Sequence, residues 1–144
     1  MKTELEFVLD IFFEDDFTAV KNFVEVFRVK PYSIWKKGDK MPGKRNRINE
    51  VTRFNYRYKV KEDCDSLTEA MKLFLSPIID NKSAVKNFLV ERNAEVQLYI
   101  YLGEIDRRFD MSIEGIAKEI LKTLNCDICF DTSYAKFFDN EDLL

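Results

Sequence analysis

The residues whose spacing could support chemistry are few, and the clearest is a C-x-x-C pair, Cys126 and Cys129, within "CDICFDTS". Such pairs hold zinc or carry out thiol redox reactions in other proteins. A structural zinc site needs four ligands, but the remaining cysteine is Cys64 and the chain has no His. If the stretch is a strand, a separation of three places the two thiols on opposite faces. We therefore expect ordinary thiols, with no metal and no cofactor.

A second candidate is the acidic run Glu14–Asp16, which could bind a divalent cation together with other carboxylates. The alternative is the first turn of a helix, where acids are favoured by the helix dipole.

The residues usually needed for catalysis are scarce in this sequence. The lack of His removes the usual general base near neutral pH. Four Gly, without a glycine-rich motif, cannot form a phosphate-binding loop. We predict no catalytic residues and a protein that is not an enzyme.

The third candidate is basic. The segment from Arg28 to Lys61 contains twelve Lys and Arg but only two acids, which gives it a local charge of +10. Out of totals of 23 bases and 26 acids, this leaves 11 and 24 for the rest of the chain, a charge of −13. The stretch "PYSIWKKGDKMPGKRNRIN" holds many of these bases and the only Trp. The candidate binding surface consists of Lys36, Lys37, Lys40, Lys44, Arg45, Arg47, Arg53 and Arg57.

Three interpretations of this basic surface stay open. It could bind nucleic acid, with Tyr32 or Trp35 stacking on bases, or another anionic protein or ligand, or it could simply be solvated. An overall net charge of −3 and a pI of about 5.2 disfavour nucleic acid, since nucleic-acid-binding domains are usually basic. We expect Trp35 to be mostly buried, and residues 40–47 to be mobile and solvated.

The elements that position these residues follow from hydrophobic periodicity. Alternation of apolar and polar residues predicts half-buried strands over 5–13, 53–60 and 94–103, with a last strand from 126. "SIWKK" is expected to pair with the strand over 53–60 as a hairpin. Stripes of apolar residues predict helices over 17–27, 66–75, 83–92 and 113–124. Expected helix boundaries are N-caps at Asp15 or Asp16, Ser66 (in a capping box with Glu69) and Ser112, a break at Pro77 and a left-handed Asn93.

The resulting order is β-α-β-β-α-β-α-β. Because each helix has one apolar stripe, the simplest burial is an α+β two-layer sandwich, with a mainly antiparallel sheet covered by helices on one face. The length of 144 residues predicts a single domain over 1–144. No apolar run approaches the roughly 18 residues that would span a bilayer. We therefore expect no membrane partner. Three Cys, an odd number, fit a reducing compartment better than a set of disulfides, so the chain is expected to be cytoplasmic.

The segment "VKPYSIWKKGD" resembles the signature of small bacterial proteins grouped as domain of unknown function 4279. The distinctive residues are Pro31, Trp35, Lys37, Gly38 and Asp39, and the resemblance runs from about Phe7 to Thr132. It implies the same order of elements and a structural turn with Gly38 at positive φ. The family has no established activity, although some members are thought to act as immunity proteins beside bacterial toxins.

The leading hypothesis is that the protein is a non-enzymatic module that binds another protein. A more specific version of this hypothesis is that it is an immunity-type partner of a toxin. The first alternative is nucleic-acid or anionic-ligand binding through the basic segment from Lys36 to Lys61. The second is a carboxylate-based enzyme acting on a phosphorylated substrate. A homodimer joined through the open sheet face is also considered, and it would bury Tyr99 and Tyr101 between two copies.

Overall fold

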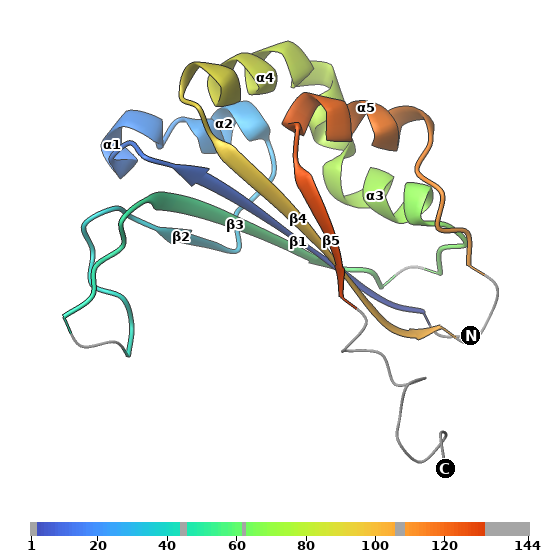
Figure 1. Ribbon diagram of the computed structural model, residues 1–144. Helices are drawn as coiled ribbons and strands as arrows, with labels where there is room; N and C mark the ends of the chain where they lie inside the picture. The colour runs from blue at the N-terminus through green and yellow to red at the C-terminus, as the bar shows by residue number, and fades with distance from the viewer. Residues whose placement is uncertain (1–2, 44–45, 62, 106–108, 132–144) are drawn as a thin grey trace.

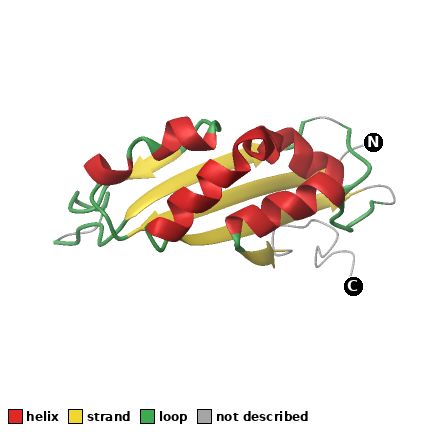
Figure 2. Ribbon diagram, turned by 90° about the horizontal axis from the view of Figure 1, so that it is seen from above, coloured by secondary structure: helices red, strands yellow, loops and turns green. Residues whose placement is uncertain are grey.

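A computed structural model of the chain describes residues 3–43, 46–61, 63–105 and 109–131. A five-stranded sheet in the order β2-β3-β1-β4-β5 carries the helices on one of its faces (Figures 1 and 2). The strands are β1 (Thr3–Phe13), β2 (Ser33–Trp35), β3 (Thr52–Lys59), β4 (Glu95–Ile105) and β5 (Asp127–Asp131). The helices are α1 (Phe17–Val20), α2 (Phe23–Phe27), α3 (Leu67–Leu75), α4 (Lys82–Glu91) and α5 (Gly115–Leu124), with the 3₁₀ helix η1 (Ser76–Asn81) between α3 and α4.

The predicted α+β class, its element order and its mainly antiparallel sheet are confirmed. The central strand β1 pairs antiparallel with β3 on one side and with β4 on the other. Strand β2 pairs antiparallel with β3, as the expected hairpin, whereas β5 runs parallel to β4. Helix α5 connects β4 to β5 and brings the chain back to the end of the sheet at which β4 begins, as a parallel pair of strands requires.

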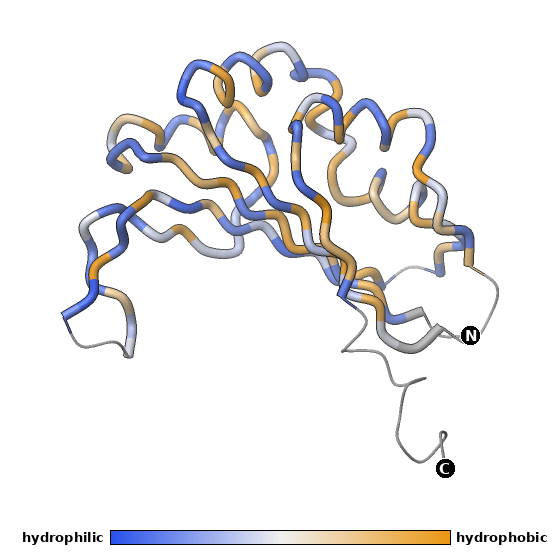
Figure 3. The backbone as a smooth tube through the Cα atoms, in the orientation of Figure 1, coloured by the Kyte–Doolittle hydropathy of each residue, from blue (hydrophilic) through white to orange (hydrophobic). Residues whose placement is uncertain are grey.

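Alternation along the strands decides which side chains form the core, and it appears as alternating orange and blue bands along the central strands (Figure 3). The residues of β1 that face the helices are fully or almost fully buried: Leu5, Phe7, Leu9, Ile11 and Phe13. Aromatic rings join the two layers, since Phe13 lies edge-on to Phe23 of α2 and to Phe88 of α4. It also lies edge-on to Phe54 of the neighbouring strand β3, and the three centroid distances are 5.5–5.8 Å.

Three of the features predicted at helix ends are confirmed: the cap at Ser66, the break at Pro77 and the left-handed Asn93. The Ser66 hydroxyl accepts a hydrogen bond from the Glu69 N–H at 3.1 Å, as the predicted capping box requires. Pro77 stands in η1, directly after the end of α3. Asn93 has φ 49°, the expected left-handed conformation.

Two helix predictions are wrong. The helix expected over 17–27 is broken into α1 and α2 at Lys21–Asn22, in a stretch rich in β-branched residues, which have low helix propensity. Asp16 is the N-cap residue of α1, but its side chain makes no cap hydrogen bond. Ser112 does not cap α5, because the helix begins two residues later than expected and has Glu114 at its N-cap position.

The prediction for Trp35 is also wrong. Its side chain is 37% exposed and does not enter the core. In β2 the residue packed against the core is Ile34, and since successive side chains alternate, Trp35 points to the other face of the sheet. The turn that follows matches the expectation, with Gly38 at φ 90°. In the same loop Lys40, Pro42, Gly43 and Arg47 are exposed.

None of the described helices is both long and apolar enough to cross a membrane.

Candidate binding surface on the open face of the sheet

The sheet face opposite the helices carries the side chains of most functional interest. We call it the open face, and in the described part of the chain no helix lies against it (Figure 1). At its centre is a depression of about 560 Å³. The lining side chains come from the three central strands: Glu6, Val8, Asp10, Phe12, Arg53, Arg57, Gln97, Tyr99 and Tyr101. Their alternate spacing on each strand is the direct result of strand geometry.

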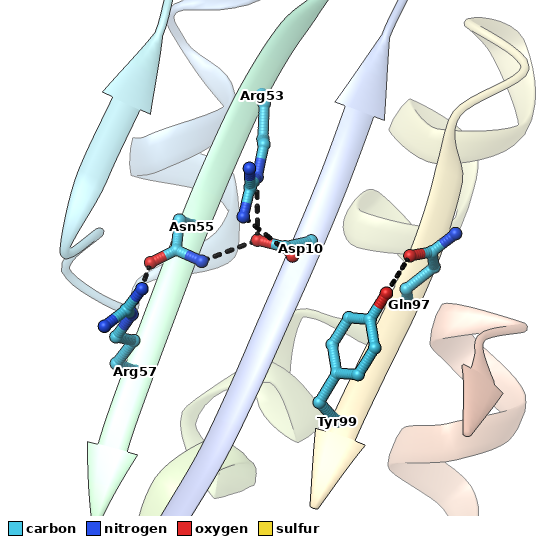
Figure 4. A network of polar contacts seen from close by, with 6 residues as sticks. All are labelled: Asp10, Arg53, Asn55, Arg57, Gln97 and Tyr99. Carbon is cyan, nitrogen blue, oxygen red and sulfur yellow. Dashed lines mark hydrogen bonds and ion pairs between the residues drawn. The ribbon is translucent and has the colours of Figure 1, made fainter. Parts of the chain in front are cut away.

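A buried carboxylate stands at the middle of the open face. The antiparallel register between β1 and β3 sets Asp10 opposite Asn55, and Arg53 lies two residues before Asn55 on β3. Arg53 Nε donates to Asp10 Oδ1, and Arg53 Nη2 donates to Oδ2, both at 3.0 Å (Figure 4). The Asp10 side chain is only 6% exposed, against 26% for Arg53. A bidentate pair of this kind fixes both position and orientation of the guanidinium group.

The network continues along β3. Asn55 Nδ2 donates to Asp10 Oδ1 at 2.6 Å, and Asn55 Oδ1 accepts from Arg57 Nε at 3.1 Å (Figure 4). Asn55 is 1% exposed although it lies on the open face, and both ends of its amide are satisfied by these bonds. A buried amide with both ends paired holds its neighbours in one arrangement.

Aromatic rings support the two arginines. The Arg53 guanidinium carbon lies 5.0 Å from the ring centroid of Trp35 and 5.6 Å from that of Phe12. The Arg57 guanidinium carbon lies 4.7 Å from the ring centroid of Tyr32. These are cation–π distances, so each arginine is held by a hydrogen bond at Nε and by a ring.

Strand β4 contributes a second polar pair. The Tyr99 hydroxyl donates to Gln97 Oε1 at 2.6 Å, and the rings of Tyr99 and Tyr101 stack at 6.2 Å between centroids (Figure 4 shows Gln97 and Tyr99). Burial raises the pKa of Tyr101 above its ordinary value, and the charge of Asp131 acts in the same direction. Tyr101 therefore presents a neutral hydroxyl to the depression at neutral pH.

The structure describes six of the eight basic residues predicted from the sequence, and they lie in three places. The Lys36 ammonium lies over the ring of Phe17 at 4.4 Å, and Lys37 Nζ donates to the Glu14 carbonyl at 2.8 Å. The next two bases, Lys40 and Arg47, are exposed in the β2–β3 loop, and the last two, Arg53 and Arg57, are on the open face. The other two, Lys44 and Arg45, fall outside the described residues.

Sequence reasoning placed Tyr99 and Tyr101 on the open face in the homodimer hypothesis, but it did not include Asp10 or Gln97 in a candidate site. Asp10 stands alone in the apolar run "FVLDIFF", which is a visible sign of a polar group with a special partner. Gln97, Tyr99 and Tyr101 alternate with the core residues of β4 and were identifiable as the outward set. Their assembly around Asp10 depends on strand order, which the sequence alone does not give.

The thiols of Cys126 and Cys129 and the acidic run Glu14–Asp16 do not line the central depression. Cys126 is half-buried, and burial together with the charge of Asp127 raises the pKa of its thiol to about 11. Cys129 is exposed on β5. Within residues 3–43, 46–61, 63–105 and 109–131, no three His, Cys, Asp or Glu side chains gather closely enough to hold a metal ion.

The match to a known family covers residues 3–135, and its description is "Domain of unknown function (DUF4279)". The chain belongs to the DUF4279 family. The matched range includes all five strands and all the residues of the open face described above. No curated protein and no solved structure matches the chain.

Proposed function

We propose that this DUF4279 protein is a non-enzymatic module that binds another protein through the open face of its sheet. The observation that carries the proposal is the network of Asp10, Arg53, Asn55 and Arg57 with its supporting rings. Interface centres are enriched in Tyr, Trp, Phe and Arg, and the open face presents these four residue types together. Arginines already fixed by hydrogen bonds and rings lose little conformational freedom when a partner binds.

The charges of the open face define the partner that fits it. Arg53, Arg57 and Lys59 lie along β3, whereas the acids of β5, Asp127 and Asp131, stand at the opposite edge. A partner with acidic groups above β3 and basic groups above β5 would be complementary in both halves. Such complementarity speeds association and suppresses wrong partners. The narrower role of an immunity-type partner for a toxin rests on the family resemblance.

The test is an affinity purification from the native host with three proteins. The first is the wild type, and the second is the double variant Tyr99→Ser/Tyr101→Ser on the open face. The third is a matched control, Leu73→Ser/Val90→Ser, which removes apolar side chains exposed on the helices (47% and 70%). Circular dichroism checks that all three are folded.

We expect a stoichiometric protein that is retained by the wild type and by the control, and lost with the open-face variant. Retention by all three proteins would place the interface elsewhere and refute the proposal. Recovery of no stoichiometric protein by the wild type would also count against it. Retention of nucleic acid in place of protein would favour the alternative of nucleic-acid binding.

A further inference from the structure

Beside the central depression, strand β3 has an edge that no strand covers in the described part of the chain. Strand β2 pairs with β3 only from Arg53 to Asn55, opposite Trp35, Ile34 and Ser33. The next residues of β3, from Tyr56 to Lys59, still pair with β1 on the other side. An uncovered edge offers backbone N–H and C=O groups to an added strand.

A second depression, of about 460 Å³, lies along this uncovered edge. Its lining combines three bases, two tyrosines and one acid: Glu6, Tyr32, Arg57, Tyr58, Lys59 and Lys61. Tyr32 is 68% exposed, which leaves one of the largest rings of the chain on the surface at the wall of a basic depression.

Two of the cationic groups of this edge depression, those of Arg57 and Lys59, are available to a ligand. Arg57 uses Nε for the bond to Asn55, and its two terminal nitrogens have no hydrogen-bond partner among the described residues. Lys59 makes no ion pair within the described chain, although Glu6 is its register neighbour on β1. Terminal guanidinium nitrogens and an ammonium group are the donors that bind carboxylates most strongly.

We infer that this edge depression binds an acidic, extended segment of the partner protein, which adds to β3 in line with β2. The backbone of the segment pairs with β3 between Arg57 and Lys59, and its carboxylates contact the side chains of the same two residues. A lysine on an edge strand disfavours pairing with another basic strand, including the same edge of a second copy of the protein. The same charge favours an acidic strand, so the edge is selective for its partner.

This inference rests on the proposed function and names the partner chemistry at one subsite. Its probe is a synthetic ten-residue peptide of alternating Glu and Thr, because this composition combines negative charge with strand propensity. The peptide is titrated into the ¹⁵N-labelled full chain, and hydrogen exchange is measured at saturation. We expect a dissociation constant below about 1 mM, shifts at Tyr32, Arg57 and Lys59, and slower exchange of the Arg57 and Lys59 amides.

Two double variants with equal loss of charge separate this site from general attraction. Arg57→Gln/Lys59→Gln should weaken the peptide at least about tenfold, since two charge-assisted contacts are lost. The control, Lys82→Gln/Lys86→Gln, alters another depression, of about 390 Å³, which lies between α4 and α5 and is lined by three lysines. It should change the affinity by less than about twofold. Glu6→Gln should strengthen binding about twofold, because it removes the like charge from the wall.

Several results would overturn the inference. One is the absence of binding at millimolar peptide, and another is an equal effect of the two double variants. Unchanged exchange at Arg57 and Lys59 would exclude strand addition. Tighter binding of a single-stranded oligonucleotide to the same residues would assign the depression to phosphates. If the peptide fails while Tyr99→Ser/Tyr101→Ser still loses the partner, this subsite is refuted and the proposed function stands.

Discussion

The ion pair between Asp10 and Arg53 allows a quantitative test of the open-face geometry. In the variant Arg53→Met the guanidinium group is removed, while an unbranched stem remains to cover Trp35 and Phe12. Asp10 then loses two of its three hydrogen bonds and keeps the one from Asn55. Removing one partner of a fully buried ion pair costs about 3–5 kcal/mol.

The cost here should be smaller, because the pair is partly solvated. The side chain of Arg53 is 26% exposed and that of Asp10 is 6% exposed, so water can replace part of the lost interaction. We therefore expect the free energy of unfolding to fall by about 2 kcal/mol, between the values for buried and exposed pairs. Urea denaturation followed by circular dichroism measures this loss, provided that the m-value is unchanged.

Arg57→Met is the matched control for this prediction. Arg57 lies on the same face of β3, but it is exposed and bonds a neutral amide, so its replacement should cost less than about 1 kcal/mol. A double-mutant cycle with Asp10→Asn should give a coupling energy of about 1.5 kcal/mol between Asp10 and Arg53. Equal costs for Arg53→Met and Arg57→Met, or a coupling below about 0.5 kcal/mol, would refute the reasoning.

Three further predictions concern Tyr56, Trp35 and Cys126. The Tyr56 hydroxyl is buried without a hydrogen-bond partner among the described residues, so Tyr56→Phe should raise the free energy of unfolding by about 1 kcal/mol. Tyr32→Phe, at an exposed hydroxyl, is its control and should change stability by less than about 0.5 kcal/mol. Trp35→Ala should cost about 1–2 kcal/mol in urea denaturation, and a loss of about 3–5 kcal/mol would indicate that the ring is buried after all. The pKa of the Cys126 thiol is raised from 9.0 to about 11, so the folded state holds this proton more tightly and the free energy of unfolding should fall between pH 9 and pH 11. The variant Cys126→Ala should remove this part of the pH dependence, and identical pH profiles for variant and wild type would contradict the assignment.

Features set by local chemistry were predictable from the sequence. The alternation in "LEFVLDIFF" fixed β1 as a half-buried strand, and the capping box at Ser66 fixed the start of α3. The face on which Trp35 lies was not predictable, because it depends on the register of β2 against β3. A shift of one residue would exchange Ile34 and Trp35 between the two faces, and three residues of β2 carry too little pattern to choose.

The candidate site was only half predictable, for the same kind of reason. Arg53 and Arg57 were part of the candidate binding surface predicted from the sequence, and both line the central depression of the open face. The partner of Arg53, Asp10, is 43 residues away from it in the sequence. A contact over this distance is created by strand pairing, and composition and spacing within one segment contain no information about it.

The uneven distribution of charge along the sequence becomes a spatial pattern through the order of the strands. The basic segment from Arg28 to Lys61 supplies β2 and β3, and these two strands are neighbours at one edge of the sheet. The remaining strands come from the acidic parts of the chain and occupy the centre and the other edge. Asp10 and Arg53 meet where the two regions adjoin, and their pairing binds β1 to β3 at that boundary. Beyond that boundary, toward the free edge of β3, the described ion pairs include none for Arg57 and Lys59, and this is where an acidic partner has most to gain.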